Sequence, residues 1–318
     1  MVGGNQLRVV FFGTPEFAMP TLEALLRSHH PLVGVVTRPD RPRDRGQKTT
    51  PAPVKKRAVA AGLPLLQPTG LTDPAFLLAL EALRADVGVV AAYGKILTDA
   101  VLATPRLGLI NVHASLLPQH RGAAPVHRAI LSGDRETGVT IMRVVRALDA
   151  GPMLAQVGRP IGVDETSHEV ERDLARMGAD LLVSTLDALA HGRVRETAQN
   201  DAVATYAHRL TKDEGLIDWT SSAERIHNLI RGLHPWPHAF TFLGDRRFIL
   251  LRSTTSSESP AAPPGTVLEA AGDRLRVVAG SGVVNLVEIQ AEGRRPMAIR
   301  DFLAGHRIAR GDVFHSRQ

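Results

Sequence analysis

Short apolar segments alternate with helical patterns up to residue 190, and this alternation is the feature that most constrains the fold. We predict strands at 7–12, 32–37 and 87–91, and helices at 54–61 and 75–83 between them. Such a repeat builds a parallel sheet covered by helices, because parallel neighbours need a long crossover connection. The sequence therefore predicts an α/β domain whose ligands bind beyond the carboxyl ends of the strands.

The pattern changes after residue 191. Before it, we predict a helix at 98–103, a strand through Asn111, strands at 137–144 and 153–159, and a long helix at 166–189. After it, a polar linker leads to a helix at 223–232, and the run at 253–264 is interpreted as a mobile loop. Turns separate several short β-rich segments, as in a small barrel; these segments are 248–251, 266–269, 274–279 and 283–289.

Two polar side chains in one apolar segment favour acyl-transfer chemistry. Asn111 and His113 lie two positions apart, so a strand points both to one face. The amide is a neutral donor, and the imidazole titrates near neutrality. Asp149 follows a second apolar segment and is the kind of group that orients an imidazole and favours its charged form. Such a set can stabilise the oxyanion of acyl transfer. Since no nucleophile is obviously paired with His113, we expect direct transfer.

Composition limits the alternatives. The 318 residues contain no cysteine, which excludes disulfides, thiolate metal sites and cysteine nucleophiles. The net charge of +6 favours a polyanionic partner, although a general preference for arginine over lysine gives the same balance. No apolar run approaches the length of a membrane span, and the first residues lack a signal-peptide pattern. We therefore expect a cytoplasmic protein with no membrane partner.

Several ordered motifs closely resemble those of the folate-dependent formyltransferases. They are Asn111-x-His113, Ser115-Leu-Leu-Pro118, Arg121-Gly-Ala-Ala-Pro125, Gly133-Asp-x-Glu-Thr-Gly-Val-Thr-Ile141 and Leu148-Asp-x-Gly151. The resemblance covers nearly the whole chain and is strongest to members that act on methionyl-tRNA. It implies a Rossmann-like parallel-sheet catalytic domain over 1–204, followed by a small β-barrel (OB-like) tRNA-binding domain over 205–318. One departure is Ala114, where the family usually has glycine, and its methyl group could crowd the nearby backbone.

The resemblance also implies substrates and residue roles. The formyl group of 10-formyltetrahydrofolate, a consumed co-substrate, would pass to the α-amino group of methionyl initiator tRNA, with no metal. Asn111 and protonated His113 would donate to the oxyanion, and Asp149 would hold His113. The residues implied to lie against the folate are Tyr93, Gly94, Ile96 and Leu97, and, after the Asn111 strand, Ser115, Leu116, Leu117 and Pro118.

A polar loop at 38–48 contains five basic and two acidic side chains. It is interpreted either as a solvated loop or as a flexible insertion that grips RNA, since arginine suits bidentate phosphate contacts and stacking. The resemblance favours RNA, because members acting on tRNA have Pro-Asp-Arg-Pro followed by Arg-Gly here. We assign Arg41, Arg45 and Lys48 to tRNA contact, with Arg45 as the leading candidate; Gln47 replaces a common family lysine.

The segment Gly13-Thr-Pro-Glu16 follows the first strand and has the pattern of a helix start, with Thr14 as N-cap and proline at the first helical position. It lacks both the Gly-x-Gly-x-x-Gly pattern and a P-loop lysine, which argues against a dinucleotide or ATP site. The resemblance implies instead that Gly13 and Thr14 lie beside the aminoacyl end of the substrate.

Three other functions stay open at this point. A glycinamide ribonucleotide formyltransferase shares the Asn, His and Asp set but generally ends near the first domain. An amino-sugar formyltransferase can have a similar length but is expected to lack the basic loop. A non-catalytic RNA-binding module would keep only the basic surface. A metal site at His113, His120 and His127 is disfavoured, because Pro118 and Gly122 break any single helix through them.

Overall fold

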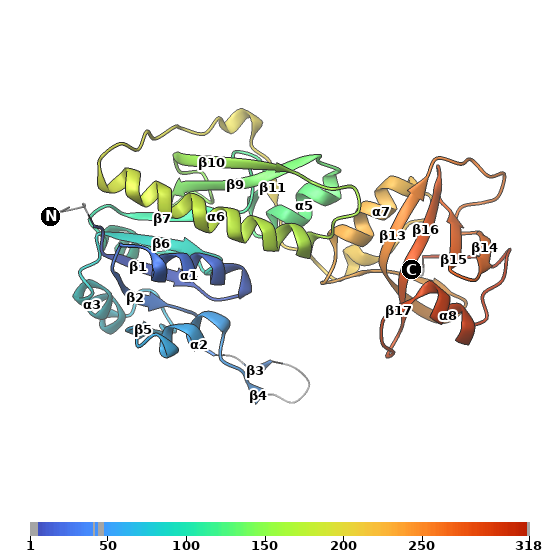
Figure 1. The fold of residues 1–318 in the computed structure, drawn as a ribbon, viewed down its shortest axis with the longest axis horizontal. Helices are drawn as coiled ribbons and strands as arrows, with labels where there is room; N and C mark the ends of the chain where they lie inside the picture. The colour runs from blue at the N-terminus through green and yellow to red at the C-terminus, as the bar shows by residue number, and fades with distance from the viewer. Residues whose placement is uncertain (1–5, 41, 44–47, 317–318) are drawn as a thin grey trace. The chain divides into compact units, whose positions relative to one another are not determined.

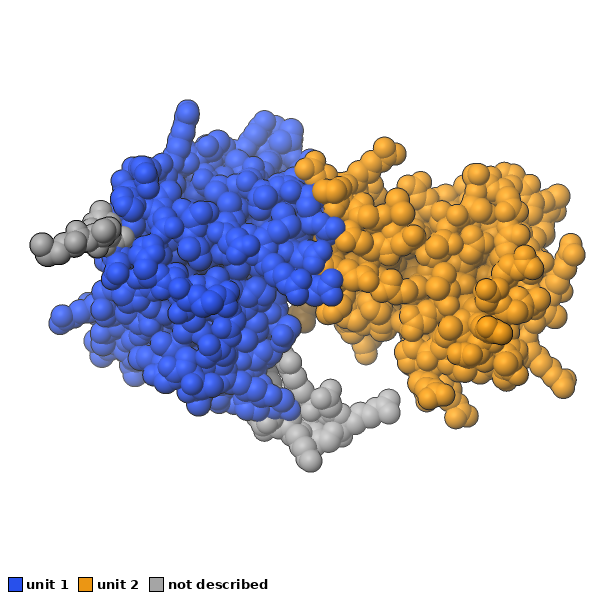
Figure 2. Space-filling model, in the orientation of Figure 1, with its two compact units in different colours: residues 1–125, 137–159, 171–207 blue, residues 126–136, 160–170, 208–318 orange. Residues whose placement is uncertain are grey.

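The structure is a computed structural model that describes residues 6–40, 42–43 and 48–316. The chain forms two compact units, shown in different colours in Figure 2. The first is drawn from residues 1–125, 137–159 and 171–207, and the second from 126–136, 160–170 and 208–318. The second unit is therefore not one continuous stretch, because two short segments that precede residue 171 belong to it.

One mixed sheet forms the centre of the first unit (Figure 1). Its order is β10 (Met153–Pro160), β9 (Glu136–Arg143), β7 (Leu109–His113), β6 (Val87–Ala91), β1 (Val9–Gly13), β2 (Leu32–Val36) and β5 (Leu65–Leu66). The neighbours from β7 to β5 run parallel, as the alternation predicts. β9 runs antiparallel to β7. The α/β prediction is confirmed, with this antiparallel addition.

Helices cover both faces of this sheet, which explains why every residue of β1 and β6 is buried. Val10 and Phe12 of β1 belong to a core shared with α3 (Pro74–Ala82) and α4 (Asp99–Ala103). On the other face, α6 (Ser167–Ala190) places Gly178 against Val112 of β7. The remaining elements here are η1 (Glu16–Ala18), α1 (Met19–Arg27), α2 (Pro53–Ala60), η2 (Asp201–Val203), the pair β3 (Pro42–Arg43) and β4 (Lys48–Thr49), and the pair β8 (Arg121–Gly122) and β11 (Tyr206–Ala207).

The predicted helix cap at Thr14 is wrong. The first helical turn, η1, begins at Glu16 after Pro15, and no side chain caps it. The Thr14 hydroxyl instead accepts a hydrogen bond from the backbone N–H of Arg38 at 3.3 Å. Thr14 therefore connects the carboxyl ends of β1 and β2.

An antiparallel sheet forms the second unit. Its order is β12 (Ala239–Leu243), β13 (Arg246–Ser256), β16 (Val283–Ala291), β15 (Arg274–Val278) and β14 (Val267–Ala271), with β17 (Met297–Ala298) beside β16. The final segment bridges both outer edges, through His315 to β12 and through Val313 to Thr266 beside β14. The sheet therefore closes into a small barrel, as predicted. Its core includes side chains from α7 (Ala223–Gly232) and α8 (Ile299–Gly305); the other helices of this unit are α5 (Pro125–Ser132) and η3 (Asp213–Gly215).

The elements α5, β12 and α8 were not predicted from the sequence, and the loop predicted at 253–264 is partly wrong. β13 continues to Ser256, and residues 253–256 pair with β16. The polar run can form a strand because Ser253 faces inward, where its hydroxyl is 3.0 Å from Nδ1 of His227. Within the described ranges, no helix combines the length and apolar character needed to cross a bilayer.

Candidate active site

The strand β7 places Asn111 and His113 at the carboxyl end of the parallel part of the sheet. Both side chains point to the face that Leu109 shares with α3 and α4, because alternate residues of a strand share a face. His113 is 5% exposed, whereas Asn111 is partly exposed and lines a cavity. The sequence prediction that the two side chains share one face agrees with this strand.

Each ring nitrogen of His113 has an oxygen atom nearby. Nε2 lies 3.0 Å from the carbonyl oxygen of His120, a distance that places the proton on Nε2. Nδ1 lies 3.7 Å from Oδ2 of Asp149, which is an ion-pair distance but too long for a hydrogen bond. The proton that His113 can gain is therefore the one on Nδ1, beside Asp149.

Asp149 follows β9 and has a φ of +47°, a region that residues other than glycine rarely adopt. Its Oδ2 accepts a hydrogen bond from the backbone N–H of Gly122 at 2.9 Å. Gly122 has a φ of +125°, and a Cβ there would lie 2.7 Å from the carbonyl oxygen of Ala207. Only glycine fits this close approach, so the Arg121-Gly122 pair of the sequence motif serves to hold the carboxylate.

A cavity of about 390 Å³ adjoins these groups, within the volume range of small-molecule sites. Its wall is largely apolar, and Asn111 and Asp149 supply polar atoms. Two cationic side chains, Lys95 and Arg146, also line it. The remaining lining residues are Val90, Gly94, Ile96, Leu97, Gly122, Ala123, Met142, Val144, Val145, Ala147 and Leu148. The geometry thus combines an apolar pocket with an amide donor and an imidazole–carboxylate pair.

Three of the residues assigned to folate contact, Gly94, Ile96 and Leu97, line this cavity. Tyr93 does not, because its ring is 1% exposed and packs edge-on against Phe12. Burial raises the pKa of Tyr93 to about 12, with Arg38 opposing this effect. Tyr93 therefore acts here as a core residue under the loop.

The segment after β7 is held by hydrogen bonds to neighbouring elements. Ser115 is fully buried and donates to the carbonyl oxygen of Gln119 at 2.6 Å, and the N–H of Leu117 donates to Thr140 Oγ1 at 3.1 Å. Leu116 and Pro118 belong to the same turn, and none of these residues from 115 to 118 is among those lining the cavity. Their assignment to folate contact stays a prediction.

The residues assigned to tRNA are only partly described. Gly13 ends β1, and Thr14 follows it. The backbone of Lys48 pairs with Arg43 between β4 and β3. Arg41 and Arg45 lie outside the described residues, as does Gln47.

Sequence reasoning missed the contribution of β9 and the segment after it to the cavity. Met142, Val144, Val145, Ala147 and Leu148 form much of the apolar wall. The apolar segment before Asp149 could have predicted this wall, because a strand paired with β7 lies close to Asn111. Met142 is directly opposite Asn111 in the sheet register.

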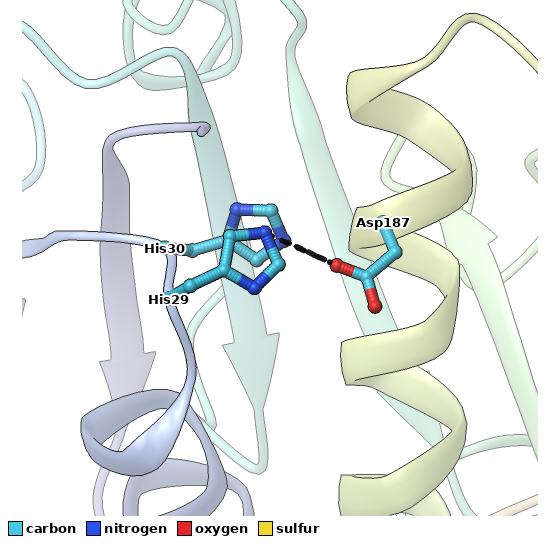
Figure 3. Close-up of side chains that lie close together, drawn as sticks. All are labelled: His29, His30 and Asp187. Carbon is cyan, nitrogen blue, oxygen red and sulfur yellow. Dashed lines mark hydrogen bonds and ion pairs between the residues drawn. The ribbon is translucent and has the colours of Figure 1, made fainter. Parts of the chain in front are cut away.

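Among the described residues, one cluster could hold a metal ion by the spacing of its nitrogen and oxygen atoms. It consists of His29, His30 and Asp187 (Figure 3). Nδ1 of His30 accepts from the N–H of Leu7 at 3.1 Å, and its Nε2 is 3.2 Å from Asp187 Oδ1. Burial lowers the pKa of His30 most, and the neighbouring His29 lowers it further. A neutral His30 therefore uses both nitrogens for hydrogen bonds, at the amino ends of β1 and β2 and away from the cavity.

The comparisons with known proteins agree with this geometry. The family model described as formyl transferase matches residues 7–186, and the model of the formyl transferase C-terminal domain matches 209–307. A methionyl-tRNA formyltransferase of Citrifermentans bemidjiense is 44% identical over 307 residues, covering 96% of each chain. One from Stutzerimonas stutzeri is 46% identical over 312 residues, covering 98% of this chain and 95% of the relative.

A solved structure supports the fold. The N-formyltransferase from Helicobacter canadensis, in complex with folinic acid and dTDP-3-aminofucose, has a TM-score of 0.67 at 17% identity, covering 88% of this chain and 99% of that one. The near-full-length likeness to the two relatives, together with both family matches, shows that the chain belongs to the formyl transferase family and, within it, to the methionyl-tRNA formyltransferases.

Proposed function

We propose that this protein transfers the formyl group of 10-formyltetrahydrofolate to the α-amino group of methionyl initiator tRNA. The observation that carries the proposal is the juxtaposition of Asn111, His113 and Asp149 beside a cavity, in a chain whose relatives are named for this activity. The sequence predicts the same three residues as an oxyanion-stabilising set.

The cavity suits the flat ring system of a folate. A largely apolar pocket with a few polar atoms favours an aromatic ligand whose orientation those atoms fix. Gly94, Ile96 and Leu97 would contact the ring, while Tyr93 and residues 115–118 would support the surrounding loops. The bound co-substrate supplies an electrophilic formyl carbon.

Each residue of the set then has a distinct role. The Asn111 amide donates to the formyl oxygen as negative charge develops on it, and Nδ1–H of protonated His113 is the second donor. Each such donor contributes about 3 kcal/mol of transition-state stabilisation when preorganised. Asp149 stabilises the imidazolium and accepts a proton from the attacking ammonium group, directly or through water. The amine nitrogen forms the new bond to carbon, the old carbon–nitrogen bond breaks, and the folate nitrogen regains a proton.

The basic residues of the loop at 38–48 and of the barrel unit support tRNA as the acceptor of the formyl group. Arg41, Arg45 and Lys48 belong to a loop whose charge suits phosphates. The barrel unit adds arginines on strands and turns, among them Arg246, Arg274 and Arg294. We accordingly propose a catalytic domain that runs to Ala207, three residues beyond the predicted boundary at 204, and a tRNA-binding domain over the rest of the chain to 318, acting in the cytoplasm.

The test compares acceptors in one assay. Purified protein and 10-formyltetrahydrofolate are incubated with methionyl initiator tRNA, methionyl elongator tRNA, glycinamide ribonucleotide or an amino sugar nucleotide. We expect transfer to the initiator tRNA and its loss in His113→Ala. Transfer to the ribonucleotide or the sugar instead would refute the tRNA assignment, and tRNA binding without any transfer would favour the RNA-binding module.

A further inference from the structure

The stretch from Thr197 to Ala207, which we name the catalytic strap, lies in the region interpreted from sequence as a linker (yellow in Figure 1). It begins with paired backbone hydrogen bonds between Thr197 and Met153, at 2.8 and 2.9 Å. It ends as β11, which runs beside β8. Between these points it contacts the backbone on both sides of the His113–Asp149 pair.

Gln199 is the part of the strap that reaches Asp149. Its Nε2 donates to the carbonyl oxygens of Asp149 and Gly151, each at 2.8 Å. Its side-chain oxygen accepts from Nε of Arg121 at 2.9 Å, and Arg121 is only 3% exposed and pairs with Asp201 at 2.7 Å. The carboxamide is therefore fixed at both ends, and it holds the turn in which Asp149 has a positive φ.

Thr205 is the part of the strap that reaches His113. Its hydroxyl accepts from the N–H of His120 at 2.8 Å, and its carbonyl oxygen accepts from the N–H of Arg121 at 2.9 Å. These bonds fix the backbone of His120, whose carbonyl oxygen is the partner of His113 Nε2. The strap thus fixes the acceptor on one side of the imidazole and the backbone of Asp149 on the other.

We infer that the catalytic strap aligns the His113–Asp149 pair and that Gln199 is a positioning residue for the reaction, an inference that rests on the proposed formyl transfer. Gln199 is not among the residues lining the cavity, so it acts through the Asp149 backbone and makes no contact with substrate there. Its loss is expected to reduce turnover without weakening substrate binding, because small misplacements of catalytic groups cost about 10²-fold in rate.

The experiment compares three variants in the full chain. Gln199→Ala removes all contacts of this side chain, and Gln199→Glu keeps an acceptor for Arg121 but has no N–H for the two carbonyl oxygens. The control is Glu81→Gln, an exposed side chain on α3 that belongs neither to the strap nor to the cavity lining. We expect kcat to fall about 10- to 100-fold in both Gln199 variants, with each KM within about threefold, and to be unchanged in the control.

A second readout does not need activity. In protein with ¹⁵N-labelled histidine, the ring signals of His113, assigned with His113→Ala, should move in the Gln199 variants and stay in place in Glu81→Gln. Unchanged ring signals, or unchanged kcat in the folded Gln199→Glu protein, would overturn the inference. If the parent protein formylates no acceptor, the proposed function fails, whereas the ring signals still decide whether the strap positions His113.

Discussion

Replacing Tyr93 with phenylalanine should make this protein more stable, although the change removes a hydroxyl group. The Tyr93 side chain is 1% exposed, and its hydroxyl has no hydrogen-bond partner among the described residues. A buried polar group without a partner costs about 1–3 kcal/mol. Phenylalanine keeps the ring and its edge-on contact with Phe12, whose centroid is 5.6 Å away. We expect Tyr93→Phe to raise the unfolding free energy by about 1 kcal/mol at pH 7.

The same side chain gives a signature at alkaline pH. The pKa of Tyr93 is raised from 10.0 to about 12, first by burial. Below pH 10 the tyrosine is neutral in both folded and unfolded chains. Between pH 10 and about 12 only the unfolded chain loses this proton, so the parent protein loses stability as pH rises. One pKa unit corresponds to 1.36 kcal/mol, so the variant should gain at most about 3 kcal/mol more over the parent in this range.

Urea unfolding followed by far-ultraviolet circular dichroism, from pH 7 to 12, measures both effects. Tyr206→Phe is the matched control, because Tyr206 is the only other tyrosine and is 56% exposed. We expect the control to stay within about 0.5 kcal/mol of the parent. A Tyr93→Phe protein that is less stable than the parent would mean that the hydroxyl has a partner. The same alkaline loss in the variant would mean that the titration of Tyr93 does not cause it. Either result would refute the reasoning.

Three other predictions concern single side chains. Asn111→Ala should lower kcat by about 10²- to 10³-fold in single-turnover formyl transfer, and a loss below tenfold would contradict an oxyanion role. Burial alone would raise the pKa of Glu169, but hydrogen bonds from Arg252 and Thr166 outweigh it and lower the pKa to about 2. The stabilisation is therefore present above about pH 4.5 and is lost as pH falls through about 2. In acid titrations, Glu169→Gln should be less stable than the parent at pH 7 by at most about 2 kcal/mol, after allowance for solvent screening, and the difference should vanish in acid. Arg45→Ala should raise KM for tRNA and leave folate affinity unchanged, whereas equal losses in both would contradict a tRNA-specific role.

The periodic parts of the fold could be predicted from sequence. β6 and α7 have the bounds that their patterns predict, because the apolar run of β6 has the length of a strand and α7 has an amphipathic repeat of helical period. The polar run at Ser253 was misjudged, since its place in β13 depends on a partner, His227, that is distant in the sequence. The strand β9 was predicted, but its antiparallel direction was not, because local patterning does not encode strand direction.

In the candidate site, too, local patterns were predictable and contacts between distant segments were not. Spacing placed Asn111 and His113 on one face, and the motif around Asp149 added the third group. The role of His120 could not be predicted, because it contributes a backbone carbonyl oxygen rather than its side chain. Gln199 was missed as well, since it lies in a polar stretch that resembles an ordinary linker, 50 positions from Asp149. Contacts made by backbone atoms leave little trace in a single sequence.

The catalytic strap sets a limit on how this protein can be divided or recombined. The first family match ends at residue 186, yet Gln199, Thr205 and β11 come later in the chain. A gene fragment that stops at the family boundary encodes the sheet and the cavity wall but omits the hydrogen bonds that hold Asp149 and His120. A shuffled protein that joins this catalytic unit to a different second domain therefore needs its junction after Ala207, because the stretch before that residue is part of the enzyme and not a spacer.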